Sequence, residues 1–144
     1  MADQFMEMTF DLIAGDFDRA GEASSKIKKT LQQIGIASDV TRRVAIGTYE
    51  AEMNVIIHSF GGTARAQIYP DHTVITMEDT GPGIADLELA SQKGYSTAPD
   101  YIREMGFGAG MGLPNMKNCS DDFSIQSKEG EGTKIVMRFM HEKT

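Results

Sequence analysis

Two pairs of short strand-like segments, each pair joined by a tight turn, constrain the fold of this chain most. The first pair covers residues 64–69 and 73–78, with a Pro-Asp-His turn between the two segments. The second pair covers residues 123–127 and 134–140, with two glycines in the connection. Strands joined by connections this short pair antiparallel, because a parallel crossover needs about a dozen residues or more. The chain is therefore expected to form a mostly antiparallel sheet.

A further strand is expected near the start of the chain. Apolar and polar side chains alternate there, which is the period of a strand with one buried face. The apolar positions are Met6, Met8, Phe10 and Leu12, and the polar positions are Glu7, Thr9 and Asp11. We expect this segment to form an edge strand of the sheet.

Three other segments have the period of helices, with apolar residues recurring at intervals of three and four. The first covers residues 18–33 and is amphipathic. The second runs from Ser38 or Asp39 to Phe60 and is apolar on nearly all sides in its later turns, which predicts a central helix. A third, short helix is expected over residues 113–120.

This order of elements predicts the fold class. Strands meet in hairpins and do not alternate regularly with helices, which favours an α/β fold with two layers: a mixed, mostly antiparallel sheet with helices on one face. At 144 residues, of which 40% are hydrophobic, the chain can bury a core of its own. We expect a single domain over residues 1–144.

Composition excludes several classes of protein. Fourteen Lys and Arg against 21 Asp and Glu give a net charge of −7, without a basic cluster, so nucleic acid is not an expected partner. No apolar run approaches the roughly 20 residues that span a bilayer, and no export signal is evident, so no membrane partner is expected. A single cysteine cannot form an internal disulfide, which fits a reducing compartment. We expect a soluble, cytoplasmic protein.

The predicted central helix carries a stripe of polar or small residues at Gly47, Glu50, Asn54 and His58. Burying a carboxylate, a carboxamide and an imidazole together is costly unless each is hydrogen-bonded or faces a ligand. The stripe therefore predicts either a polar cleft or a satisfied internal network. In a cleft, the amide oxygen of Asn54 could bind a hard cation, and Glu50 could act as a base.

Two glycine-containing segments are further candidates for a binding site. Asp79 ends an apolar strand and begins the sequence Asp-Thr-Gly-Pro-Gly, which would let the backbone approach a flat ligand but is also a plain turn signal. Residues 106–112 have glycine at every second position and then open a helix. Such a segment can present backbone N–H groups to a phosphate, although a flexible surface loop is the alternative.

These motifs occur in a fixed order and are most informative together. They are Glu50-Ala51-Glu52-Met53-Asn54-Val55-Ile56-Ile57-His58, Asp79-x-Gly81-x-Gly83, Gly108-x-Gly110-x-Gly112 and Gly132-Thr133. Over about residues 40–140 the chain resembles the GHKL ATPases, which have the Bergerat, histidine-kinase-like ATPase fold. Within them it looks most like the bacterial anti-sigma factors and switch serine/threonine-protein kinases.

The resemblance implies roles for individual residues. Asn54 is implied to coordinate a Mg²⁺ ion that bridges the ATP phosphates, and Glu50 to act as general base on the attacking hydroxyl. Asp79 is implied to accept a hydrogen bond from the adenine amino group, and Thr133 to support that contact directly or through water. The glycines divide between shaping the adenine pocket, at Gly81 and Gly83, and donating amides to the phosphates, at Gly108, Gly110 and Gly112. Residues 92–103 are implied to form a mobile lid.

The resemblance also implies an activity and partners. The chain is expected to bind ATP and ADP, and to transfer the γ-phosphate to a Ser or Thr of a small regulatory protein, such as a STAS-domain anti-sigma antagonist. A sigma factor is the less favoured partner, because Phe107 and Ala109 stand where sigma-binding members have an Arg, and Arg103 lies earlier. The alternative is a nucleotide-gated anti-sigma-type module that sequesters a partner without phosphotransfer. Homodimers are common in this group.

Overall fold

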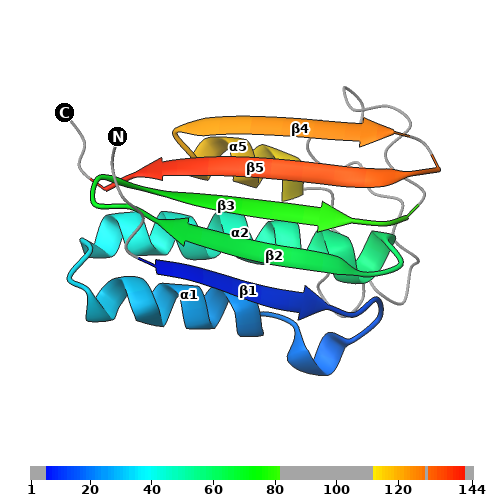
Figure 1. The fold of residues 1–144 in the computed structure, drawn as a ribbon, viewed down its shortest axis with the longest axis horizontal. Coiled ribbons are helices and arrows are strands. Elements are labelled where there is room, and N and C mark those ends of the chain that lie inside the picture. The colour runs from blue at the N-terminus through cyan, green and yellow to red at the C-terminus, as the bar shows by residue number, and fades with distance from the viewer. Residues whose placement is uncertain (1–5, 82–111, 129, 142–144) are drawn as a thin grey trace.

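The protein forms a two-layer α/β sandwich (Figure 1). The computed structural model describes residues 6–81, 112–128 and 130–141. In this part of the chain, five strands form one sheet in the order β1-β2-β3-β5-β4, and every neighbouring pair is antiparallel. Three α-helices cover one face of the sheet (Figure 1), so the predicted fold class is confirmed. The elements are β1 (Met6–Leu12), a 3-10 turn (Phe17–Arg19), α1 (Glu22–Gln33), α2 (Ser38–His58), β2 (Gly62–Ile68), β3 (His72–Asp79), α5 (Gly112–Cys119), β4 (Asp122–Lys128) and β5 (Gly132–Met140).

Both predicted hairpins are present, and the bounds of their strands differ from the predicted ones by at most two residues. β1 pairs with β2 at the edge of the sheet, as predicted. β3 also pairs with β5, which joins the two hairpins into one sheet. This register places Asp79, the last residue of β3, opposite Thr133 near the start of β5.

The core lies between the sheet and the helices. Alternate residues of the strands point into it, as expected for a sheet with one covered face. The opposite face carries cross-strand ion pairs between Arg65 and Glu7 and between Lys134 and Glu78, each at 3.8 Å. Side chains that are fully enclosed in the core include Ile27, Leu31, Val44, Ala64, Ile68, Ile75, Met116, Met137 and Phe139.

Helix α1 begins later than the periodicity predicted, at Glu22 and not at residue 18. Gly21 has φ +91°, a backbone conformation that ends the preceding turn and is open to glycine at little cost. The carboxylate of Glu52, on α2, then accepts backbone N–H bonds from Gly21, Ala23 and Ser24 at 3.1–3.3 Å. The first turn of α1 is thus capped by a side chain from another helix, which no local pattern could reveal.

Helix α2 ends at His58, two residues before the predicted end. Ser59 is extended, and the backbone N–H of Phe60 donates to the carbonyl of Thr80 at 2.7 Å. The N–H of Thr80 in turn donates to the carbonyl of Gly61 at 3.1 Å. These two bonds compete successfully with another helical turn, and they fix the end of α2 beside the end of β3.

No helix in the described segments has both the length and the apolar character needed to cross a bilayer.

Candidate functional site

Of the predicted site residues that the structure describes, Asp79, Gly81 and Thr133 lie together at one end of the sandwich, while Glu50 and Asn54 lie on α2 behind the sheet. β3 ends at this end of the sheet and β5 begins there, and the last turns of α2 lie behind them (Figure 1). Helix α5 runs along the same face of the sheet and is packed against α2. The strand order, rather than proximity in sequence, brings these segments together.

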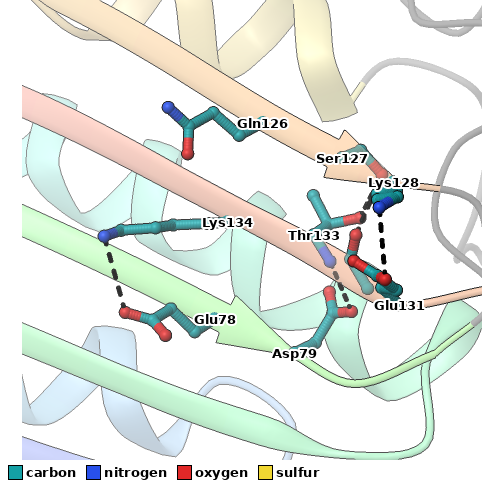
Figure 2. A pocket seen from close by; sticks show the side chains of 9 residues that line it. Glu78, Asp79, Gln126, Ser127, Lys128, Glu131, Thr133 and Lys134 are labelled. Carbon is teal, nitrogen blue, oxygen red and sulfur yellow. Dashed lines mark hydrogen bonds and ion pairs between the residues drawn. The ribbon is translucent and has the colours of Figure 1, made fainter.

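Asp79 is the best-defined member of the site. Its Oδ1 atom accepts a hydrogen bond from the backbone N–H of Thr133 at 3.1 Å (Figure 2). The side chain is partly buried, and this burial raises the pKa of the carboxyl, while the Thr133 N–H offsets part of the rise. No hydrogen bond from the described residues reaches the second oxygen, Oδ2. That oxygen can therefore accept a hydrogen bond from a ligand.

A pair of hydroxyl groups supports Thr133. Its Oγ1 lies 2.8 Å from the Oγ of Ser127, on β4, and either oxygen could be the donor. Ser127 also donates to the carbonyl of Gly132 at 3.2 Å. Ser127 lies outside the sequence motifs, although the hairpin register, in which it faces Thr133, is a signal that could have identified it.

Two glycines allow the close approach of backbones at this end of the sheet. Gly132 has φ +125°, and a Cβ atom there would lie 2.1 Å from the carbonyl oxygen of Asp79. At Gly81, a Cβ atom would lie 2.9 Å from the Cα of Ser59, at the end of α2. A side chain at Gly132 would push β3 away from β5, and a side chain at Gly81 would push the end of β3 away from the end of α2. Gly81 therefore has a packing role that is independent of any ligand.

A shallow polar pocket opens between the ends of β3, β4 and β5 (Figure 2). Charged pairs line it, including Lys134 with Glu78 and Lys128 with Glu131, the second at 3.3 Å. These side chains neutralise one another. Asp79 and Thr133 form part of its wall (Figure 2).

The predicted polar stripe on α2 divides into two environments. Gly47 packs against the sheet, where a Cβ atom would lie 3.1 Å from the ring of Phe139. Glu50, Asn54 and His58 are partly buried at successive turns of the helix. Burial lowers the pKa of His58, because removal from water disfavours the charged ring. Gly47 therefore belongs to the packing of α2 on the sheet, and the other three residues form the polar face.

Glu50 is hydrogen-bonded across the helix pair. The Nδ2 atom of Asn115, on α5, donates to its Oε1 at 3.2 Å. Asn115 could not be identified from the sequence, because it lies outside the motifs and its contact spans 65 residues of chain.

The described residues provide no ready-made metal cage. No group of three or more His, Cys, Asp or Glu in residues 6–81, 112–128 and 130–141 could hold a metal ion. Magnesium, however, usually keeps several waters and takes only one or two protein oxygens together with substrate phosphates. The partly buried carboxamide of Asn54, one turn from the Glu50 carboxylate, fits that donor set.

Part of the predicted site lies outside the described residues. Gly83, Gly108 and Gly110 belong to that part, as does the segment 92–103 that was expected to form a lid. Gly112 is the first residue of α5, so the glycine series leads directly into a helix, as predicted.

Comparison with known proteins identifies the family. Residues 13–139 match the histidine kinase-like ATPase domain. The chain belongs to this family. ATP is therefore the ligand class of the domain, and the match covers every element of the site described above.

Proteins similar to this ATPase domain include several named anti-sigma F factor. One, from Heyndrickxia coagulans, is 40% identical over 96 residues, which cover 62% of this chain and 62% of the relative. One from Bacillus subtilis (strain 168) is 34% identical over 111 residues, 73% of each chain. One from Clostridium acetobutylicum is 34% identical over 120 residues, 80% of this chain and 76% of the relative.

Proposed function

We propose that this ATPase domain is a Mg²⁺-ATP-dependent serine/threonine-protein kinase of a bacterial partner-switching system. One observation carries the proposal: a carboxylate at Glu50 and a carboxamide at Asn54 lie one helical turn apart on the partly buried face of α2. A carboxylate in that place can act as a base, a role that nucleotide binding alone does not require.

Asp79 is the proposed adenine-binding residue. Its Oδ1 is held by Thr133, so its Oδ2 has a fixed direction and can accept from an exocyclic amino group. A positioned carboxylate oxygen of this kind distinguishes adenine from guanine, which presents a carbonyl at the same ring position. Gly81 and Gly83 are proposed to let the base lie close to the backbone.

The phosphates are assigned to Asn54 and the glycine series. The Asn54 oxygen is proposed to bind Mg²⁺, and the backbone N–H groups of Gly108, Gly110 and Gly112 to donate to phosphate oxygens. When bound, Mg²⁺-ATP supplies the phosphoryl group and the positive charge that balances its oxygens.

Glu50 is the proposed general base. Its carboxylate accepts the proton of a Ser or Thr hydroxyl on the partner protein as that oxygen bonds to the γ-phosphorus. The bond between the γ-phosphorus and the bridging oxygen breaks, and ADP leaves with the electron pair. Phosphoryl transfer asks little more of a protein than this positioning and charge balance.

The proposed substrate is a small regulatory protein, and a STAS-domain antagonist is the first to test. A second function is favoured by the relatives named anti-sigma F factor: a nucleotide-gated module that sequesters a sigma-type partner without transfer. The two functions differ in what they require of Glu50.

The test is transfer of label from γ-labelled ATP with Mg²⁺ to purified STAS-domain proteins of the same organism. Wild type is compared with Glu50→Ala, and with Glu22→Ala, an exposed carboxylate on α1, as the matched control. We expect label on a Ser or Thr with wild type and the control, and a loss of about 100-fold or more with Glu50→Ala at unchanged ATP affinity. Binding of ATP by wild type and Glu50→Ala without transfer by either would favour the sequestering module.

A further inference from the structure

We propose that Asn115 is a positioning residue for the proposed general base, fixing the Glu50 carboxylate from the neighbouring helix. The inference rests on the proposed function, because it concerns the direction in which Glu50 presents its oxygens. The observation behind it is the bond from Asn115 Nδ2 to Glu50 Oε1, at 3.2 Å between α5 and α2.

The place of Asn115 on α5 is fixed by its neighbours. Leu113 and Met116 are buried in the core, with 5% and 0% of their surfaces exposed. They flank Asn115 on the helix and hold it against the sandwich, while Lys117 and Asn118 face solvent. The packing of α5 against the core thus fixes the backbone position of Asn115 beside α2, within hydrogen-bond distance of Glu50 for its side-chain amide.

A second polar contact fixes the other end of α5. Arg43, two turns before Glu50 on α2, donates from Nη1 to the carbonyl of Cys119 at 3.0 Å and lies 3.4 Å from Asp121. Cys119 is the last residue of α5, where a cation also interacts favourably with the helix dipole. Because Arg43 and the apolar contacts already hold the two helices together, the Asn115 amide is not needed to dock α5.

The chemistry of the pair points to a role in orientation. A carboxamide N–H can donate to a carboxylate but cannot take a proton from it, so Asn115 does not compete for the substrate proton. With Oε1 engaged, Oε2 is the oxygen left to accept that proton. No other hydrogen bond from the described residues reaches Glu50, so without Asn115 its carboxylate would sample several rotamers.

The first test measures the hydrogen bond directly and needs no activity. In ¹⁵N-labelled protein, the side-chain amide signals of Asn115 are assigned by their loss in Asn115→Leu. We expect them to shift in Glu50→Gln and to stay in place in Glu131→Gln, which changes an exposed carboxylate. Signals that stay in place in Glu50→Gln would overturn the proposal.

The second test separates positioning from binding. Asn115→Leu preserves the size of the side chain and removes the donor, and we expect kcat for transfer to fall about 10- to 100-fold while KM for ATP changes less than about twofold. Asn115→Gln, which restores an N–H donor, should recover part of the loss. Asn118→Leu, on the exposed side of the same helix, is the matched control and should behave as wild type.

Two further measurements make the outcome decisive. Thermal unfolding of each variant shows whether it is folded, and Asn115→Asp, which keeps the shape but presents a second carboxylate, replaces Asn115→Leu if that variant does not fold. Normal kcat in a folded donor-less variant overturns the role of Asn115 alone. Transfer that survives Glu50→Ala, or that is absent in wild type, overturns the proposed function and this inference with it.

Discussion

The carboxylate of Glu52, on α2, accepts a hydrogen bond from the backbone N–H of Gly21 at 3.1 Å, at the entrance to α1. The same carboxylate also accepts from the N–H groups of Ala23 and Ser24, both at 3.3 Å. It therefore satisfies donors that a helix normally leaves free at its first turn. Glu52 is only 1% exposed, and this burial raises the pKa of its carboxyl while the three N–H groups offset part of the rise. Glu52 is thus a structural carboxylate, in contrast to Glu50 on the polar face of the same helix.

Replacing Glu52 should loosen α1 from α2. We expect Glu52→Ala to lower the free energy of unfolding by about 2–3 kcal/mol, because it leaves buried N–H groups without an acceptor. Glu52→Gln keeps one acceptor oxygen and should lower it less. Urea denaturation gives both values, with Glu22→Ala as the exposed control. Equal stability of Glu52→Ala and wild type would contradict this assignment.

The strands could be predicted because their signals are local. Alternation in residues 6–12 and the short turns within 64–78 and 123–140 identified the five strands that the structure describes, and the turns also identified the two hairpin pairs. The ends of α1 and α2 were misplaced because distant groups decide them. Glu52 starts α1 from a position 31 residues beyond Gly21, and Thr80 ends α2 by binding the N–H of Phe60.

The site could be predicted only in part, for a related reason. The motifs located Glu50, Asn54, Asp79 and Thr133, and the structure brings Asp79 and Thr133 into direct contact. Their supporting residues, Ser127 and Asn115, are ordinary polar residues in sequence. Their partners become visible only once β4 is paired with β5 and α5 is packed on α2.

Gly132 should tolerate no side chain. A Cβ atom there would lie 2.1 Å from the Asp79 carbonyl oxygen, and φ is +125°. We expect Gly132→Ala to lower the free energy of unfolding by more than about 2 kcal/mol, because both the backbone strain and the clash must be relieved. Gly130→Ala is the matched control: φ is +82°, nothing lies within 4 Å, and a cost of about 1 kcal/mol is expected. Similar losses of unfolding free energy in both variants would contradict the prediction, because they would show that the clash at Gly132 adds nothing to the cost of the backbone conformation.

Stability should fall when the pH drops below neutral, in part because of His141. The ring is buried, with Nε2 at 2.7 Å from the Thr73 hydroxyl and Nδ1 at 3.2 Å from the Pro70 carbonyl oxygen. Burial lowers its pKa, so the unfolded chain binds the proton more readily than the folded protein does. The contribution of His141 is therefore present above the ordinary pKa of 6.5 and is lost as the pH falls through it.

The pH dependence can be measured by urea denaturation between pH 8 and about 5.5. One such group can contribute a slope of at most about 1.4 kcal/mol per pH unit. His141→Gln should flatten the curve, and His58→Gln should flatten it separately, because burial lowers the pKa of His58 as well. A His141→Gln curve parallel to that of wild type would show that the buried ring does not set the slope.

The adenine-binding assignment of Asp79 leads to a prediction with a sharp chemical contrast. Asp79→Asn can keep its side-chain oxygen on the Thr133 N–H, but it turns the other oxygen into an N–H₂ donor. A donor facing the adenine amino group cannot bond to it, so we expect ATP affinity to fall about 10- to 100-fold while the fold is retained. Glu78→Gln, at the preceding position of β3 and on the other face of the sheet, is the matched control and should bind ATP as wild type does.

Titration of both variants with ATP and with GTP by calorimetry checks the assignment. Because guanine offers a carbonyl at the position of the adenine amino group, Asp79→Asn should lose less affinity for GTP than for ATP. Equal losses of affinity for the two nucleotides would show that Asp79 does not contact the base.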